Sequence, residues 1–165
     1  MSLVAVHAGE SATSRTRALA AAALEFGGGG ELIELSQLPA DGLLGRTPDP
    51  AVEAAVAAVV GASTLVLASP VYRATVSGVM KAFLDRLPTG GLAGTAVVLG
   101  ATAGSRDHFL SLDTSGRALV ASLAGWSVPT VVYATSADIV DGKVSDELEA
   151  TLRQALAEAS LVGGA

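Results

Sequence analysis

The sequence predicts a doubly wound α/β fold, in which a parallel sheet is covered by helices on both faces. Two observations indicate this class: the strand-like segments are continuously apolar, and a segment with a helical pattern follows each of them. Continuous apolar strands are typical of sheets that are buried on both faces, where right-handed crossovers place the helices. With 165 residues and 50% hydrophobic content, we expect one domain over residues 1–165.

The first half of the chain alternates expected strands and helices. The strands are LVAVHA at 3–8 and ELIELS at 31–36, and the helices are SRTRALAAAALEF at 14–26 and AVEAAVAAVVG at 51–61. Ser14 is a favoured capping residue, and the Asp49-Pro50 pair suits a helix start. The glycines at 27–30 break the first helix, and LPADGLLGRTPDP at 38–50 reads as a loop.

The second half continues the same alternation. The expected strands are 64–69 (TLVLAS), 94–102 (GTAVVLGAT) and 128–135 (VPTVVYAT), and the expected helices are 75–87, 107–125 and 145–161. Ser145 is the expected cap of the last helix, with Glu147 and Glu149 in its first turn. Five strands without a sixth favour a flavodoxin-like three-layer α/β/α sandwich with a five-stranded parallel sheet in the order 2-1-3-4-5.

Composition excludes several classes of function. The net charge of −6 disfavours binding to nucleic acid or to an anionic membrane surface. The chain has no cysteine, so disulfides and thiolate chemistry are excluded, and its two histidines leave no credible zinc site. The start of the sequence does not resemble a signal peptide and no segment stays apolar long enough to span a bilayer, so we expect a cytoplasmic protein.

The loop after the first strand has the composition of a phosphate site. Ligands of such sheets bind at the carboxyl ends of the strands where the strand order reverses, and the loops after strands one, three and four meet there. The first loop offers Gly9, the hydroxyls of Ser11, Thr13, Ser14 and Thr16, and the cation Arg15. Backbone N–H groups, hydroxyls and a helix dipole suit phosphate, and without a Walker A or G-x-G-x-x-G pattern a monophosphate is favoured. Alternatively, Ser14 only caps its helix.

The other two loops could hold a planar ring. In SPVYRA at 69–74, Pro70 fixes the turn and removes one donor, and Tyr72 offers an apolar ring face. Alternatively, Tyr72 is a half-exposed packing residue. The loop GATAGSRD at 100–107 is small and Gly-rich, which permits close backbone approach to a flat ligand.

Several of these residues belong to segments that resemble a known protein family. The segment SPVYRATVSGVMKAFLDRLP resembles the P-x-Y, S-G-x-x-K-x-x-(L/I)-D segment of NADPH-dependent FMN reductases; the matching residues are Pro70, Tyr72, Ser77, Gly78, Lys81 and Asp85. HFLSLDTSGRALVASL at 108–123 is similar to the matching helix of the sulfonate-utilisation branch. With AGESATSRTRAL, the similarity covers most of the chain from Leu3 to about Thr135.

The resemblance implies a flavodoxin-like fold that binds FMN and receives hydride from NAD(P)H. It also implies transfer of reduced FMN to a separate monooxygenase, and a homodimer or homotetramer. Carried over by position, Ser14, Arg15 and Thr16 would bind the phosphate, Pro70, Val71 and Tyr72 would line the flavin, and Thr102, Ala103 and Gly104 would cover its far edge. Ser11 is a further phosphate candidate, and Arg73 or Arg106 could meet a 2′-phosphate of NADPH.

Two departures from the family pattern affect this site. Where the family usually has G-S-x-R, this chain has Gly9-Glu10-Ser11-Ala12, so an Arg is missing and a carboxylate is added. Lost pairing and added repulsion should weaken phosphate binding, unless Arg15 or Arg17 compensates, so we predict weakly bound, exchangeable FMN. In the third loop, Ala103 adds a Cβ near the ring where a second Gly is often found.

Four further residues could have a role outside the candidate pocket. Lys81 and Asp85 are one helical turn apart and can pair. The family resemblance implies an oligomer interface there, and a solvated pair is the alternative. His108 could meet the second cofactor, but a surface or packing role is more common for such a residue. Trp126 is expected to pack against a neighbour.

The leading hypothesis is therefore an NAD(P)H-dependent FMN reductase that needs no acid or base side chain of its own, because the two cofactors carry the hydride chemistry. An NAD(P)H:quinone reductase on the same fold is the nearest alternative. A flavin-binding electron carrier without NAD(P)H turnover, or a non-catalytic flavodoxin-like oligomer, is an alternative of a different class.

Overall fold

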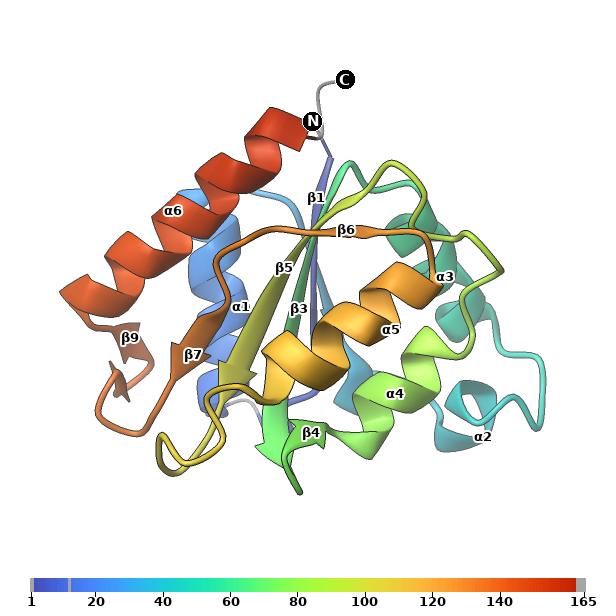
Figure 1. Cartoon of the computed structure of the whole chain (residues 1–165). Helices are drawn as coiled ribbons and strands as arrows, with labels where there is room; N and C mark the ends of the chain where they lie inside the picture. Colours follow the sequence, from blue (N-terminus) through green and yellow to red (C-terminus); the bar gives the residue numbers. More distant parts are fainter. Residues whose placement is uncertain (1, 12, 163–165) are drawn as a thin grey trace.

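The sheet has the predicted strand order. The computed structural model describes residues 2–11 and 13–162. Its sheet runs β2 (Glu31–Glu34), β1 (Leu3–His7), β3 (Thr64–Tyr72), β5 (Ala96–Thr102) and β6 (Trp126–Ser127), all parallel, with β7 (Val132–Ala134) also parallel to β5 (Figure 1). The fifth expected strand is thus present as two short pieces. With the added β4, the sheet has seven strands, so the predicted count of five is approximate.

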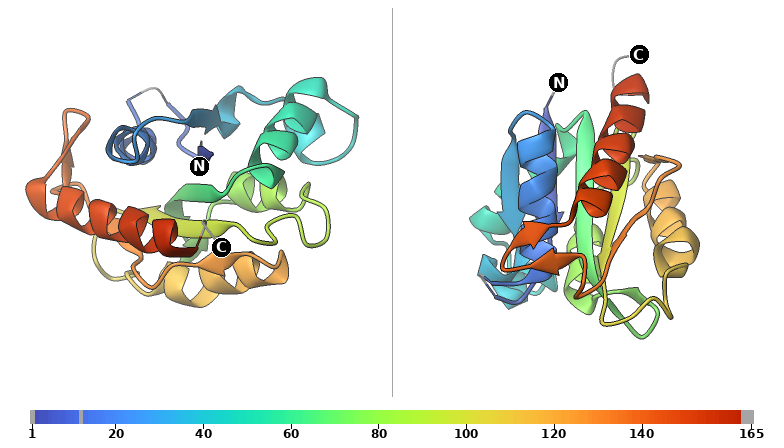
Figure 2. Two further views of the ribbon diagram at one scale, coloured as in Figure 1. Left: turned by 90° about the horizontal axis from the view of Figure 1, so that it is seen from above. Right: turned by 90° about the vertical axis from the view of Figure 1, so that its left-hand side faces the viewer.

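Helices cover both faces of this sheet. Helices α1 (Arg15–Phe26) and α6 (Asp146–Val162) lie on one face, and α3 (Pro50–Val60), α4 (Gly78–Leu84) and α5 (Arg117–Ser122) lie on the other (Figure 2). Alternate residues of β1 enter the two cores: Val4 and Val6 pack toward α3 and α4, whereas Leu3 and Ala5 pack toward α1 and α6. This confirms the predicted three-layer flavodoxin-like sandwich.

Four helices begin at capping residues, and three of these caps, Ser14, Asp49 and Ser145, were expected from the sequence. Ser14 accepts a hydrogen bond from the Thr16 N–H (3.2 Å), and Ser145 accepts one from the Leu148 N–H (3.3 Å). Asp49 accepts from the Ala51 and Val52 N–H groups, with Pro50 at the first helical position. Ser77 caps α4 by accepting from the Met80 N–H (3.3 Å). Each cap satisfies donors that a helix start leaves open.

Strand β3 is longer than the sequence indicates. It continues through Pro70, which pairs with Thr102 of β5, and turns back into the antiparallel β4 (Thr75–Val76). The prediction that SPVYRA forms a loop and that a helix begins at Thr75 was therefore wrong. Because the pairing of β1 with β3 ends at Ala68, Pro70 pairs with β5 alone and has one open edge, where Pro is tolerated.

The helix expected over residues 107–125 is broken. Residues 107–110 form turns, a π-helical turn spans Leu112–Gly116, and only Arg117–Ser122 is α-helical. Gly116 lies close to Leu99 and Leu112, so a Cβ at this position would have only 3.2 Å to the Leu99 side chain. The π-helical turn thus places Gly116 against the sheet. The hydrogen-bond pattern of such a turn cannot be predicted from the spacing of apolar residues.

The fifth strand is interrupted where Arg117 binds its backbone. Its guanidinium donates to the carbonyls of Val128 (2.7 Å) and Pro129 (2.6 Å), between β6 and β7, and its Nε donates to Asp113 (2.9 Å). Pro129 also lacks the N–H that a continuous strand would need. Trp126, in β6, has 65% of its surface exposed, so the expected packing against a neighbour within the chain is not present.

Short elements complete the chain. A 3₁₀ turn (Leu35–Gln37) and α2 (Ala40–Leu43) occupy part of the expected loop before α3, and the hairpin β8 (Ile139–Val140) and β9 (Lys143–Val144) precedes α6. None of the helices in the described residues has the length and apolar character needed to cross a membrane.

Candidate active site

Ten of the eleven predicted binding residues meet at one pocket. The pocket has a volume of about 400 Å³ and lies at the carboxyl ends of β1, β3 and β5, as expected for the position where strand order reverses. Its lining residues are Glu10, Ser11, Thr13, Ser14, Arg15, Thr16, Pro70, Val71, Tyr72, Thr102, Ala103 and Gly104. Three loops that are far apart in the sequence therefore converge as predicted, with Glu10 and Thr13 in addition.

The first loop is held in a compact conformation by its own side chains. The Ser14 N–H donates to the Ser11 carbonyl (3.0 Å), and the Ser14 hydroxyl lies against Gly9 so closely that a Cβ on residue 9 would collide with it. The Gly9 N–H donates to Nδ1 of the buried His7 (3.1 Å). This loop presents the first turn of α1, whose partly unsatisfied N–H groups and dipole favour an anion.

A buried hydroxyl pair joins the first and third loops. The Oγ1 atoms of Thr16 and Thr102 are 2.6 Å apart, and these residues are 2% and 6% exposed. Thr16 lies in the first turn of α1 and Thr102 ends β5, so this bond fixes the helix start relative to the sheet edge. The Ala103 N–H donates to the Ala134 carbonyl (2.9 Å), which anchors the third loop from its other side.

The end of β3 presents Tyr72 at the rim of the pocket. Tyr72 is 50% exposed, so its ring is available to a ligand. The next two residues, Arg73 and Ala74, have φ values of 54° and 60°, a two-residue turn that favours Asn and Gly. Ser69 braces the turn, because its hydroxyl accepts the Ser77 N–H (2.9 Å) and donates to the Pro70 carbonyl (2.9 Å).

Arg73 is the one predicted residue that does not line this pocket. It lies at the tip of the β3–β4 turn, in a neighbouring apolar groove of about 730 Å³ between α4 and α5 that Tyr72 also borders. His108 and Arg106 are exposed in the turns before the π-helical segment and line neither space. The structure therefore does not bring these cations to the ten converging residues.

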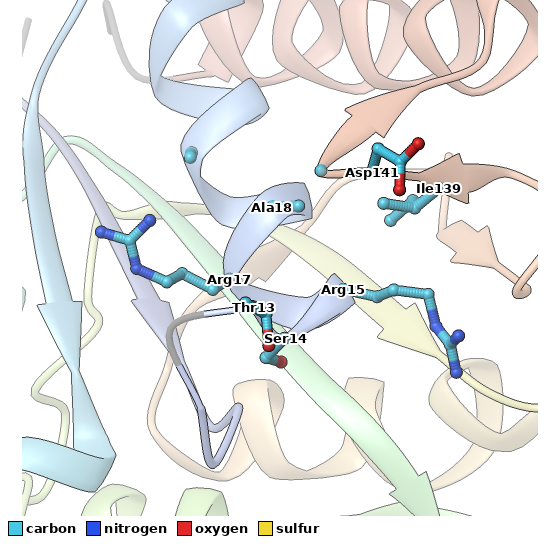
Figure 3. Close-up of a pocket in the computed structure, with 9 residues that line it drawn as sticks. Thr13, Ser14, Arg15, Arg17, Ala18, Ile139 and Asp141 are labelled. Atoms are coloured by element: carbon cyan, nitrogen blue, oxygen red, sulfur yellow. The ribbon is translucent and has the colours of Figure 1, made fainter.

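Charges around the first loop are unevenly placed. Arg15 and Arg17 extend to opposite sides of α1 (Figure 3). Arg17 pairs with Glu34 of β2 (3.2 Å), so it does not replace the missing family Arg. Arg15 lines the pocket and also a second groove of about 610 Å³, which it shares with Asp141 of the β8–β9 hairpin. The charged residues that line the candidate pocket are thus one carboxylate, Glu10, and one cation, Arg15.

Sequence reasoning missed the layer beneath the loop. His7 and Glu34 end the neighbouring strands β1 and β2, and they face each other in register, with 3.3 Å between Nε2 and Oε2. Burial lowers the pKa of His7 against the opposing effect of Glu34, and the Arg17 guanidinium lowers the pKa of Glu34. A polar residue at the end of an otherwise apolar strand was the available signal.

Among the described residues, no cluster of His, Asp and Glu could hold a metal ion.

Comparison with known proteins agrees with this geometry. Residues 1–138 match the family described as NADPH-dependent FMN reductase. The chain is 36% identical to NADH-dependent FMN reductase SfnF of Pseudomonas fluorescens, over 99% of this chain and 92% of that protein. It is 35% identical to FMN reductase (NADPH) of Pseudomonas aeruginosa, over 98% of this chain and 92% of that protein.

A solved structure extends the similarity to three dimensions. NADH:FMN oxidoreductase in its apo form superposes with a TM-score of 0.88 at 32% identity, covering 97% of this chain and 88% of that one. A WrbA-like flavodoxin from Agrobacterium tumefaciens, at 16% identity and a TM-score of 0.65, shares the fold. The resemblance seen in the sequence is thus confirmed, and this chain belongs to the NADPH-dependent FMN reductase family of oxidoreductases.

Proposed function

We propose that FMN binds in the 400 Å³ pocket and is reduced there by NAD(P)H. The phosphate would lie at Ser11, Ser14, Arg15 and Thr16, and the isoalloxazine between Pro70–Tyr72 and Thr102–Gly104. One observation carries this assignment: three loops from distant parts of the sequence form one pocket, with a helix N-terminus at one end and an exposed aromatic ring at the other. The family shows FMN and NAD(P)H chemistry, and the pocket offers a place for it.

The residues of the pocket suit binding and orientation rather than acid–base chemistry. Bound FMN would supply the hydride acceptor, because flavins carry this redox chemistry themselves. The protein's part is to hold the phosphate with hydroxyls and amides, to offer Tyr72 as a flat apolar surface, and to bring the backbone of Ala103 and Gly104 close to the ring. The open space at Gly104 supports this, since nothing lies within 4 Å of a Cβ built there.

Binding of FMN should be weak and exchangeable. Glu10 lines the pocket beside Arg15, and Arg17 is engaged with Glu34 on the opposite side of α1 (Figure 3). A phosphate would therefore meet one cation and one carboxylate, a poorer balance than two cations would give. An FMN that exchanges freely suits delivery of reduced flavin to a separate monooxygenase, which is the role we propose.

We also propose that the chain works as a homodimer or homotetramer in the cytoplasm. The apolar groove between α4 and α5 supports self-association, because it offers an accessible apolar surface bordered by Lys81. The Lys81 ammonium is 2.6 Å from Asp85, and both side chains are about half exposed, so the pair is open to a second subunit. Light scattering during gel filtration tests the state; a strictly monomeric species at all concentrations would contradict it.

A matched pair of capping variants tests the FMN site. Ser14→Ala removes the capping hydroxyl of α1 at the pocket, and Ser145→Ala removes the capping hydroxyl of α6, outside the pocket. Each should lower stability by about 1 kcal/mol, the usual value of a capping serine. FMN affinity, measured by quenching of flavin fluorescence, should fall only for Ser14→Ala.

Riboflavin serves as the control ligand, because it lacks the phosphate. The two variants should bind riboflavin equally if Ser14 acts on the phosphate. Equal loss of FMN affinity in both variants, or none in either, would place the phosphate elsewhere. Reduction of a quinone in preference to free FMN would favour the quinone reductase, and FMN binding without NAD(P)H oxidation would favour the electron carrier.

A further inference from the structure

His7 occupies an unusual position beneath the proposed phosphate loop. His7 is the last residue of β1 and is fully buried, with 0% of its surface exposed. Its ring lies among the loop, β2 and α1. Nδ1 accepts the Gly9 N–H at 3.1 Å. A neutral imidazole that accepts at Nδ1 carries its proton on Nε2, and that atom faces the Glu34 carboxylate at 3.3 Å, without the geometry of a full hydrogen bond.

We propose that His7 is a positioning residue for FMN, which holds the phosphate loop in its binding conformation through the Gly9 amide only while its imidazole is neutral. This inference rests on the proposed function, because it takes the first loop as the phosphate site. His7 does not line the pocket, so it acts through the loop rather than on the ligand. No other part of the mechanism uses this buried group.

Protonation would convert the contact from attractive to repulsive. An imidazolium has a donor on both ring nitrogens, so Nδ1–H would face the Gly9 N–H and the buried amide would lose its acceptor. An unsatisfied buried donor is costly, and the loop would move to relieve it. Gly9 is packed against the Ser14 hydroxyl, so movement of Gly9 reaches the cap of α1 directly.

The charges around His7 set the direction of the pH dependence. The groups that face it are Glu34 from β2 and Arg17 from α1, which pair with each other at 3.2 Å. Burial is the main cause that keeps the pKa of His7 below its usual value, Glu34 opposes it, and Arg17 adds to it. The neutral form of His7 therefore prevails at neutral pH. As the solution becomes acidic, His7 is protonated and the phosphate loop loses its binding conformation.

Two substitutions at His7 separate its acceptor from its titration. In His7→Asn, the side-chain oxygen can take the place of Nδ1 as acceptor and carries no titratable proton. In His7→Leu, the acceptor is lost at every pH. FMN dissociation constants are measured for each between mildly acidic and neutral pH, with circular dichroism to verify that the variant is folded.

The wild type should lose FMN affinity on acidification, and His7→Asn should lose less. His7→Leu should bind about tenfold more weakly at neutral pH, which corresponds to about 1.4 kcal/mol and lies within the usual cost of leaving a buried donor unsatisfied. The FMN phosphate itself titrates near pH 6, at about its usual second pKa, but all variants share that contribution. Glu34→Gln is the second test: without the carboxylate that raises the pKa of His7, the loss should move to lower pH.

The outcomes distinguish this inference from the proposed function. If the wild type does not bind FMN at any pH, the proposed function fails. If the wild type binds FMN but shares one pH profile with His7→Asn and Glu34→Gln, or if His7→Leu binds as tightly as the wild type, the role of His7 is overturned. A steeper loss in the wild type, a shifted one in Glu34→Gln and uniformly weak binding in His7→Leu would support it.

Discussion

The hydroxyl pair of Thr16 and Thr102 gives a sharp test of how the pocket is assembled. Replacing Thr16 by Val keeps the shape of the side chain and removes its hydroxyl. Thr102 is only 6% exposed, and its hydroxyl then loses the partner at 2.6 Å. A buried hydroxyl without a partner costs about 1–3 kcal/mol, so Thr16→Val should destabilise the fold by about 2 kcal/mol.

The double variant tests whether this cost comes from the broken pair. Thr16→Val with Thr102→Val removes both hydroxyls, so neither is left unsatisfied, and such a replacement is close to neutral. The double variant should therefore be less destabilised than the sum of the single variants, by about 1 kcal/mol or more of coupling. Urea denaturation at equilibrium measures all four free energies of unfolding.

In thermal terms, 1 kcal/mol corresponds to about 2–4 °C in Tm for a chain of this size, so Thr16→Val should melt several degrees lower than the wild type. FMN affinity should fall in both single variants if the bond holds the helix start in place. Strictly additive free energies of unfolding would refute the reasoning, because they would show that the two hydroxyls do not depend on each other.

Three further predictions concern single residues. Gly9→Ala places a Cβ against the hydroxyl that caps α1, so Tm and FMN affinity should both fall, whereas Gly78→Ala, with open space at its Cβ, should change neither; equal effects would contradict the crowding at Gly9. Glu10→Gln removes a carboxylate from the pocket, so FMN should bind about 2- to 5-fold more tightly at low salt and riboflavin should be unaffected; unchanged FMN binding would place the phosphate away from Glu10. Hydrogen bonds from the Thr135 N–H and hydroxyl hold the pKa of Asp138 below its usual value, so its contribution to stability is present above the usual Asp pKa and disappears as pH falls through the lowered one. Asp138→Ala should therefore lose less stability on acidification than the wild type, and equal losses in urea denaturation would contradict this.

The sequence was sufficient for the layers and for most of the pocket. Strand order, the caps at Ser14, Asp49 and Ser145, and the convergence of three loops follow from local patterns and from one general rule on α/β sheets. Each of these features depends on residues that are close in sequence or on the order of elements. That residues 1–165 form one domain stays a prediction.

The features that were missed depend on contacts between distant residues. The interruption of the fifth strand requires Arg117 to reach the Val128 and Pro129 carbonyls, and no local pattern encodes that reach. The extension of β3 through Pro70 depends on β5 continuing beside it after β1 has ended.

Two features around the pocket were not foreseen for the same reason. Arg73 was expected to be able to meet the 2′-phosphate of NADPH, and the turn formed by Arg73 and Ala74 places it in the neighbouring groove, outside the pocket. His7 was passed over because its role becomes visible only when Glu34 of the adjacent strand and the Gly9 amide are placed around it. Pairing across strands and folding back of a loop both depend on contacts between residues that are not neighbours in the sequence.

The most direct test of the central claim is the oxidation of NADH and NADPH by the purified protein as free FMN is varied. The account predicts that turnover requires added FMN, saturates with it, and falls in Ser14→Ala but not in Ser145→Ala. Flavin binding without any oxidation of NADH or NADPH would contradict it.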